Sequence, residues 1–302
     1  MANGFNLGGL SSYTNQTGEI LYKAIAPQTL IDSVKVMTDV KMPRAINLLD
    51  MDLHLQSTSC ALTATGATYF TQRTLTPCKI THYDKFCVSD LEGYWTAEKL
   101  SPGSTYMDLD YFKNDIMDLL HKKIGLGVQK LGWMGNTDTG SGYLSLCDGW
   151  IKTLSGDTTH QSTGGTTITA SNIVSVINAM ILKTPEALAG TEINIYLSHT
   201  LYNMFVQGWA AAYGSGPYFI DNTQKAHPFY ANYLFKPQSG LEGYSYIVMT
   251  YKDNLVFGTD INDEWSMTDI ERGVGADKYI HITTSWKQGV QIAFPDQVIA
   301  NF

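Results

Sequence analysis

"SPGSTYMDLDYFKNDIMDLLHKKIGLGVQKLGWMGNTDTG", residues 101–140, carries the clearest helical pattern in this chain of 302 residues. Its apolar residues recur every three or four positions and so share one helix face: Leu109, Phe112, Ile116, Leu120, Ile124 and Val128. Ser104 or Thr105 can cap the N-terminal end. Gly125 and Gly127 weaken the helix late in the run. The pattern predicts a slightly bent helix of about 25 residues that is buried along one face.

The segment before this helix, residues 45–91, has β-type patterns. "MDLHLQ" (51–56) alternates polar and apolar residues, and "ATYFTQRTLTPCKIT" (67–81) is rich in Thr and aromatic residues. "ALTATGAT" (61–68), with Gly66 at its tip, is typical of a turn. These runs predict a long two-stranded excursion. A hairpin with so few large apolar residues does not stabilise itself in water, so we expect it to lie on another surface, most readily another subunit.

The N-terminal region contains two further segments. Residues 1–27 are rich in Gly, Asn, Ser and Thr, which is typical of an extended arm that a partner surface orders. "TLIDSVKVMT" (29–38) has Leu30, Ile31, Val34 and Met37 at near-helical spacing, and a proline follows at position 43. It predicts a short helix.

The second half of the chain mixes helices and strands. "LSLCDGWIKTL" (144–154) is predicted as a strand or turn, and a helix follows from a cap near Thr169 to a stop before Pro185. "TEINIYLS" (191–198) predicts a strand, Ser198 caps a third helix, and the chain from residue 218 onward is β-like. No repeat or linker divides the chain. We predict an α+β fold whose last strands return to the long helix.

Composition narrows the function classes. Only 16% of residues are charged, while the chain has 18 Tyr and 6 Trp, a balance typical of surface that becomes buried in interfaces. The net charge is −8 and the cationic residues are scattered, which argues against a nucleic-acid-binding face. The N-terminus has no signal-peptide pattern, and the longest apolar run, "IVSVINAMIL" (173–182), is too short to span a bilayer. We expect a soluble protein made in the cytoplasm.

The cysteines and histidines do not form a recognisable metal motif. Cys60, Cys78, Cys87 and Cys147 show no C-x-x-C spacing, and an intracellular chain would keep them reduced. A zinc site from Cys60, Cys78, His82 and Cys87 can be drawn, but its loop lengths match no known rule. We therefore expect free thiols. The seven histidines, at 54, 82, 121, 160, 199, 227 and 281, never approach H-x-x-x-H spacing.

An acidic run, "VFGTDINDEWSMTDIE" (256–271), approximates the ligand order of a calcium loop. The oxygen-bearing residues at the relevant positions are Asp260, Asn262, Glu264, Ser266, Thr268 and Glu271. Trp265 stands where the loop needs Gly, and a strand-like segment precedes it where a helix should enter. An acid/base pair of Asp260 and Asp263 has no partner motif. The run most readily forms a solvated turn.

Other catalytic patterns fail in the same way. Ser198 and His199 are only adjacent, "YGSGPY" (213–218) lacks the order of a nucleophile elbow, and "IGLGVQKLG" (124–132) lacks the strand that a dinucleotide loop requires. We predict no catalytic, cofactor-binding or metal-binding residues, no cofactor and no enzymatic activity.

The order of segments along the chain resembles the major capsid proteins of tailed bacteriophages, the Hong Kong ninety-seven type shell fold that encapsulins and the floor of herpesvirus capsids share. The resemblance rests on the arm, the Thr-rich excursion before the long helix, "LGWMGNTDTGSGYLSLCDGWIK" (131–152) after it, and "TEINIYLSHTLYNMF" (191–205). Its most specific part is the ending, residues 252–302, in which "NLVFGTD" (254–260) precedes late strands and a G-V-Q-I strand.

The resemblance implies an N-terminal arm (1–38), an extended loop (39–90), a peripheral domain with the spine helix (91–165 and 275–302) and an axial domain (166–274). It implies self-assembly into hexamer and pentamer capsomers and an icosahedral shell around double-stranded DNA. Expected partners are other copies of the chain, a portal and possible decoration proteins. Because the sequence begins directly at the arm, the resemblance also implies either a separate scaffold protein, which Met1 favours, or a mature form given without its leader. The alternatives are an encapsulin-like nanocompartment shell and, from another class, a secreted β-rich adhesin or lectin.

Overall fold

The structure is a computed structural model that describes residues 30–57, 66–87, 110–165, 167–213, 232–260, 268–272 and 279–302. The α-helices are α1 (Leu30–Ser33), α3 (Asp110–Met134), α4 (Trp150–Gly156), α5 (Ile173–Leu182) and α6 (His199–Tyr213). The strands are β1 (Lys35–Met37), β2 (Arg44–Asp52), β3 (Ala67–Leu75), β4 (Cys78–Cys87), β5 (Gln161–Ser162), β6 (Ile193–Leu197), β7 (Tyr233–Pro237), β8 (Ile247–Thr250), β9 (Leu255–Thr259), β10 (Thr268–Arg272), β11 (Tyr279–Ile292) and β12 (Ile299–Asn301).

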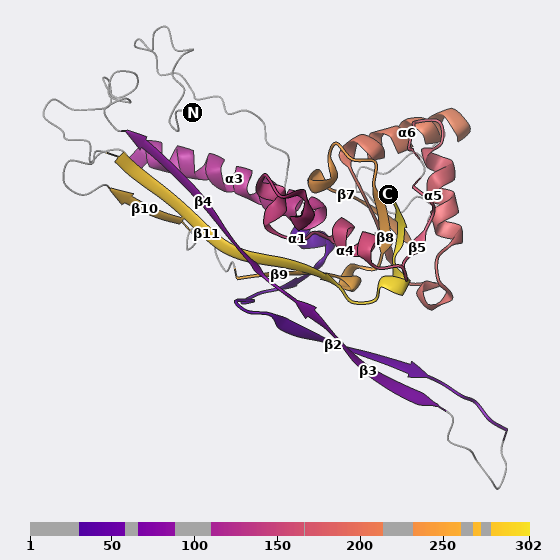
Figure 1. The fold of residues 1–302 in the computed structure, drawn as a ribbon. Coiled ribbons are helices and arrows are strands. Elements are labelled where there is room, and N and C mark those ends of the chain that lie inside the picture. Colours follow the sequence, from indigo (N-terminus) through magenta and orange to yellow (C-terminus); the bar gives the residue numbers. More distant parts are fainter. Residues whose placement is uncertain are drawn as a thin grey trace, which may run out of the picture.

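The long helix α3 lies along a sheet that we call the spine sheet (Figure 1). In this sheet β11 pairs antiparallel with β4, β10 and β9, and β1 joins β9 in parallel. Ile124 and Leu131 of α3 pack with Ile80 of β4 and Trp286 of β11 in one apolar cluster. The predicted helix and its length are confirmed, and so is the return of a late strand to it.

A second sheet, which we call the axial sheet, has the strand order β5-β12-β8-β6-β7. Its two faces belong to different apolar clusters. Ile193, Ile195 and Leu197 of β6 pack with α5 and α6, whereas Tyr196 packs with Trp133 and Trp150 at the ends of α3 and α4. All five residues of β6 are therefore buried, because helices cover the strand from both sides.

The predicted excursion before the long helix is a two-stranded hairpin. Strands β2 and β3 pair antiparallel from Arg44↔Leu75 to Asp52↔Ala67, and the hairpin extends away from both larger sheets (Figure 1). Thr76 and Pro77 then interrupt the run, and β4 continues into the spine sheet instead of the hairpin. A proline lacks the N–H that a continuous strand would use, which fits a break at this point.

Two local predictions were correct only in part. The predicted helix over 29–38 is reduced to the four residues of α1, since Lys35–Met37 pair with Val256–Gly258 of β9. The segment 144–154, predicted as a strand or turn, contains a 3-10 turn (Tyr143–Leu146) and helix α4. Trp150, Ile151 and Leu154 of α4 are buried in the cluster between the sheets, so tertiary packing decides both segments.

Candidate assembly surface

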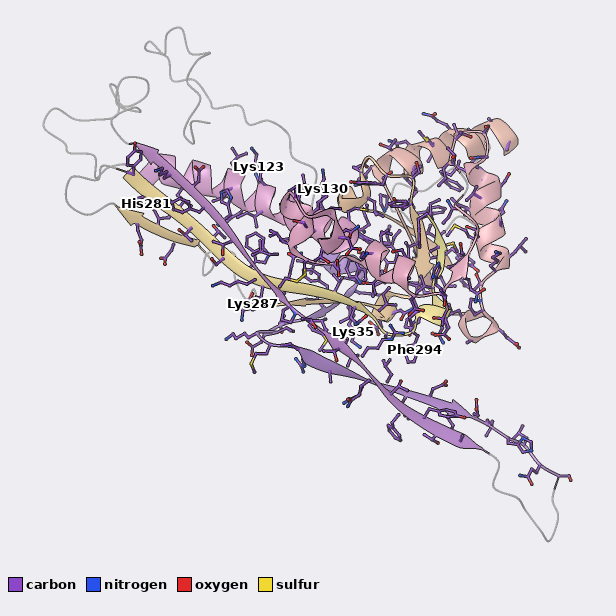
Figure 2. The ribbon with its side chains drawn as sticks, in the orientation of Figure 1. Lys35, Lys123, Lys130, His281, Lys287 and Phe294 are labelled. Atoms are coloured by element: carbon purple, nitrogen blue, oxygen red, sulfur yellow. A yellow bond between two sulfur atoms is a disulfide. The ribbon has the colours of Figure 1, made fainter. Side chains whose placement is uncertain are left out.

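The hairpin β2–β3 presents an apolar face to solvent. Directly paired residues lie on the same side of an antiparallel ladder, so Leu49 and its partner Phe70 share a face with Met51. Phe70 is 80% exposed, and Leu49 and Met51 are both more than half exposed. Figure 2 shows side chains projecting into the open along the length of the hairpin. We call Leu49, Met51 and Phe70 the hairpin face.

Exposed apolar residues continue past the end of β2, where Leu53 and Leu55 are 77% and 82% exposed. Monomeric proteins rarely leave a contiguous apolar surface of this kind uncovered. Gln72 Nε2 donates to Asn47 Oδ1 across the strands at 2.8 Å, so polar pairing supports the ladder on the same face. The hairpin holds its shape through backbone pairing and leaves its apolar side chains available for contact with a partner.

The base of the hairpin is firmly attached to the body of the molecule. Leu75 is completely buried with Val40 and Val256. Gln291 Nε2 of β11 donates to the Thr74 carbonyl oxygen at 2.7 Å. These contacts fix the direction in which the hairpin leaves the body.

An ion pair adds to this attachment. Arg73 Nη2 lies 3.2 Å from Asp157 Oδ2. The carboxylate also accepts from the Thr159 hydroxyl at 2.6 Å and from the Thr159 backbone N–H at 3.0 Å. The Thr159 hydrogen bonds and then Arg73 hold the pKa of Asp157 below its ordinary value. The carboxylate is thus kept in the charged form that Arg73 requires.

The residues of the predicted calcium-like run do not assemble into a described metal site. Asp260 follows β9, and its Oδ1 accepts from the Lys287 backbone N–H at 2.5 Å, so it joins β9 to β11. Thr268 and Glu271 lie on β10, where Thr268 Oγ1 is 3.2 Å from Thr284 Oγ1. Asn262, Asp263, Glu264 and Ser266 fall outside the described residues. The expectation of a strand before Asp260 is confirmed.

The other candidate residues have structural roles where the structure describes them. Ser198 Oγ accepts from the Leu201 N–H at 3.1 Å, which confirms the predicted cap of α6. Gly125, Gly127 and Gly132 lie inside α3, so they form no dinucleotide loop. Within the described ranges, no group of three or more His, Cys, Asp or Glu residues could hold a metal ion. None of the helices described there is long and apolar enough to cross a membrane.

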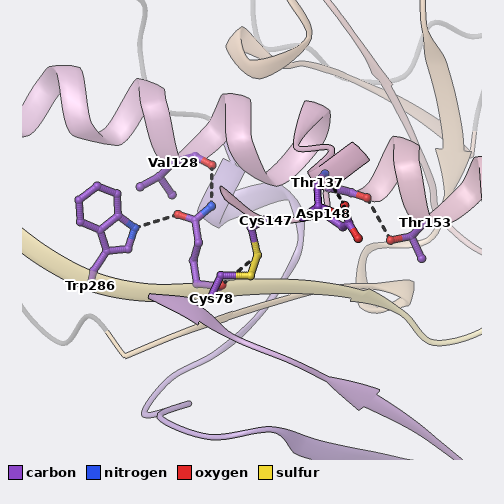
Figure 3. Close-up of a disulfide and its surroundings, with 9 residues drawn as sticks. Cys78, Val128, Thr137, Cys147, Asp148, Thr153 and Trp286 are labelled. Carbon is purple, nitrogen blue, oxygen red and sulfur yellow. Dashed lines mark hydrogen bonds between the residues drawn. A yellow bond between two sulfur atoms is a disulfide. The ribbon is translucent and has the colours of Figure 1, made fainter. Parts of the chain in front are cut away.

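The prediction of free thiols was wrong for two of the four cysteines. Cys78, the first residue of β4, forms a disulfide with Cys147, which follows the 3-10 turn after α3 (Figure 3). Their separation of 69 residues conceals the pairing in the sequence. The bond also removes Cys78 from the zinc set that could be drawn with Cys60, His82 and Cys87. Cys60 and the side chain of Cys87 lie outside the described part of the structure.

Comparisons of the whole chain find structural relatives only. No protein-family description and no curated protein sequence matches it. The capsid of Myoviridae phage XM1 matches with a TM-score of 0.62 and 10% identity, covering 95% of each chain. The capsid of the native GTA particle matches with a TM-score of 0.62, 12% identity and coverage of 95% and 94%. A chain from Gordonia phage Cozz matches with a TM-score of 0.65, 11% identity and coverage of 95% and 90%. The chain shares their fold, which confirms the predicted α+β capsid-type architecture.

Proposed function

We propose that this chain is the major capsid protein of a tailed bacteriophage, which self-assembles into the icosahedral shell that encloses a double-stranded DNA genome. One observation carries the proposal: the likeness to solved capsid chains extends over about 95% of this chain and of most of those chains. A structural role without catalysis fits the described residues, whose polar candidates serve as caps and strand links.

We propose the following division of the chain into the parts of such a subunit. We assign residues 1–38 to an N-terminal arm and 39–90 to an extended loop, of which hairpin β2–β3 is the projecting part. Residues 91–165 and 275–302 would form the peripheral domain, which includes α3 and β11. Residues 166–274 would form the axial domain, which includes α5, α6 and strands β6, β7 and β8 of the axial sheet. Within the same bounds, β9 and β10 pair with β11 and so extend the spine sheet.

The hairpin face supplies a physical reason for assembly. Burying a large apolar side chain contributes about 1.5–3 kcal/mol relative to leaving it exposed. Leu49, Met51 and Phe70 are exposed in the single subunit, so a neighbouring subunit that covers them gains this free energy at each contact. Repeated around a closed shell, such contacts favour assembly although each one is small.

The net charge suits enclosure of DNA better than binding to it. A subunit with a formal charge of −8 and no dense basic stripe gains little from counterion release on phosphates. The genome would be held by confinement and would remain free to slide. Scaffold, portal and decoration proteins would complete the particle, and assembly would take place in the host cytoplasm.

The proposal is tested by expressing the full chain alone and with candidate scaffold proteins from its own genome. Size-exclusion chromatography and negative-stain microscopy are expected to show capsomers or closed shells. A chain that stays monomeric under all of these conditions would contradict the proposal. Nucleic-acid analysis of particles from the native source separates the alternatives, since a phage capsid contains DNA and an encapsulin-like shell contains a cargo enzyme.

A matched pair of variants tests the hairpin face. Leu49→Ser with Phe70→Ser is expected to reduce the shell yield at least tenfold, because it removes apolar area that a neighbouring subunit would bury. The thermal unfolding of the variant should stay close to that of the unaltered chain, because both side chains are exposed in the single subunit. The control, Asp50→Ser with Thr71→Ser, changes the opposite face of the same strands and should assemble normally. Normal assembly of the first variant would exclude this face as a contact.

A further inference from the structure

We propose that Cys78 and Cys147 form an oxidation-dependent staple, which closes only after the reduced subunit has folded and which then locks α3 onto the spine sheet. The disulfide joins two parts of the subunit that are 69 residues apart in the chain. Cys78 begins β4, and Cys147 lies in the connection between α3 and α4. Everything between them, α3 included, becomes a closed covalent loop when the bond forms.

The connection that carries Cys147 is held in place without the disulfide. Asp148 Oδ1 accepts from both the backbone N–H and the hydroxyl of Thr137, each at 2.8 Å (Figure 3). The Asn136 N–H donates to the Leu144 carbonyl oxygen at 2.7 Å, and the Gly149 N–H donates to the Gly135 carbonyl oxygen at 2.8 Å. The fold therefore presents Cys147 to Cys78 before any covalent bond exists.

The position of Cys78 is held independently as well. The ladder between β4 and β11 runs from Cys78↔Gln288 to Cys87↔Tyr279. Gln288 links this ladder to α3, because its Nε2 donates to the Val128 carbonyl oxygen at 3.4 Å and its Oε1 accepts from Trp286 Nε1 at 2.9 Å (Figure 3). Both cysteines are thus placed by hydrogen bonds and apolar packing in which neither sulfur takes part, so the reduced chain can form them as well.

The buried sulfur of Cys147 has an acceptor beside it that the reduced thiol would use. Cys147 is 4% exposed, and its Sγ, bonded to Cys78 in the structure, lies 3.6 Å from the Gln288 carbonyl oxygen, so an S–H group at this position would reach it with a weak hydrogen bond. Cys78 is only partly buried, so a soluble disulfide reaches it first. Cys87 does not compete for Cys78 inside one subunit, because it lies at the other end of β4, about 30 Å away at the rise of a strand.

The chemistry is thiol–disulfide exchange with a low-molecular-weight disulfide such as oxidised glutathione. The Cys78 thiolate attacks one sulfur of the oxidant and releases one glutathione thiolate, which leaves a mixed disulfide on Cys78. The Cys147 thiolate then attacks the Cys78 sulfur and releases the second glutathione. The two protein thiols lose two protons and two electrons, and the oxidant is reduced to two thiols.

The timing rests on the proposed function, whereas the bond itself does not. A capsid subunit made in a reducing cytoplasm would keep both thiols. Release of the particle into an oxidising medium would then close the staple in every subunit. The disulfide would then hold α3 on the spine sheet. It would form only after the assembly steps, in which the subunit needs to change its conformation.

The test follows the thiols of the full chain by mass spectrometry. Cells are lysed directly into N-ethylmaleimide, and a second sample of purified soluble chain is first incubated with oxidised glutathione. Trypsin releases "TLTPCK" (74–79) and "LGWMGNTDTGSGYLSLCDGWIK" (131–152). We expect both peptides to be alkylated in the first sample, and to be joined to each other, with a mass two hydrogens below their sum, in the second.

Thermal unfolding supplies a second readout. Oxidation should raise the Tm of the chain by roughly 5–10 °C, since a cross-link that closes a long loop restricts the unfolded state. The Cys78→Ser/Cys147→Ser variant should lose this shift, and the matched Cys60→Ser/Cys87→Ser variant should keep it. Soluble chain is used throughout, so failure to form shells would count against the proposed function alone.

Three results would overturn the proposal. The first is that Cys78 and Cys147 remain alkylatable after oxidation of the folded chain. The second is that either of them is joined to Cys60 or Cys87. The third is that the cross-link is already complete in the cells lysed into N-ethylmaleimide, which would make it a constitutive bond.

Discussion

Gly258 shows how a single residue holds the base of the hairpin. It lies in β9 between Met37 of β1 and Gly289 of β11. A Cβ atom at this position would be 2.6 Å from Leu75 Cδ2 and 3.0 Å from Leu75 Cδ1. Leu75 is completely buried at the end of β3, so it has no free space to move into. The missing side chain at 258 is what allows the hairpin to seat against the spine sheet.

Gly258→Ala is therefore expected to destabilise the subunit by about 1–3 kcal/mol, the usual cost of overpacking a core. Gly127→Ala is the control, because it is a helical position of α3 where a Cβ meets no atom within 4 Å beyond the neighbouring helix backbone. That change should stabilise by about 0.5–1 kcal/mol, since Ala favours the helix. Urea unfolding of the unassembled chain measures both, and equal stability of the two variants would refute the argument.

At the scale of elements, the contact between α3 and the spine sheet organises half of the molecule. Of the predicted apolar stripe, Leu109 and the side chains of Phe112 and Ile116 lie outside the described residues. Its other members, Leu120, Ile124 and Val128, pack in the cluster around Trp286. Leu131, one turn beyond the predicted stripe, is 2% exposed and belongs to the same cluster. Lys123 projects from the exposed side of α3 (Figure 2). The apolar face that the residue spacing predicted is therefore the face of α3 that packs on the spine sheet.

Leu131→Ala should cost about 2–5 kcal/mol, because it opens a cavity between a rigid helix and a rigid sheet. Lys123→Ala, at an exposed position of the same helix, should change the stability by less than about 0.5 kcal/mol. Chemical unfolding followed by tryptophan fluorescence can measure the difference, since Trp286 lies in this cluster and other tryptophans lie in the core beside it. A loss below 1 kcal/mol for Leu131→Ala would mean that the helix docks elsewhere.

At the scale of the whole molecule, a buried polar junction joins the axial sheet to the chain segment that enters the spine sheet. The Tyr196 hydroxyl of β6 donates to the Ser33 carbonyl oxygen at 2.5 Å and accepts from Asn194 Nδ2 at 3.0 Å. Gln238 Nε2 donates to the Ser33 hydroxyl at 3.1 Å. Such a network stabilises one relative position of the two sheets, because other positions leave buried polar groups without partners.

Tyr196→Phe is expected to destabilise the subunit by about 1–3 kcal/mol, since it leaves the Ser33 carbonyl and the Asn194 amide with fewer partners. Burial raises the pKa of the Tyr196 phenol far above its ordinary value. The unfolded chain then loses this proton first, so the contribution is complete below about pH 10 and falls as the pH rises above it.

The stability of Tyr196→Phe should consequently decline less steeply above pH 10 than that of the unaltered chain. Unfolding curves between pH 8 and about pH 11 can check this. Identical slopes for the two proteins would show that the phenol is accessible to solvent and not part of a closed junction.

Local patterns in the sequence determined the elements whose signals do not depend on distant partners. The spacing of apolar residues predicted α3 and α5, Ser198 marked the start of α6, and the scarcity of large apolar residues in 45–91 identified an excursion that needs a partner surface. The candidate surface was thus predicted as a segment, but its apolar face was not, since strand register decides which side chains share a side.

The remaining features were decided by contacts between residues far apart in the chain. Lys35–Met37 form a strand because they pair with β9, which lies more than 200 positions later in the chain. Trp150 lies in a helix because that segment packs into the core between the two sheets. Cys78 and Cys147 lie within bonding distance because α3 runs back along the spine sheet and returns the chain to the start of β4 (Figure 1). Sequence spacing encodes the periodicity of one element, whereas pairing, burial and covalent cross-links depend on which elements come together in three dimensions.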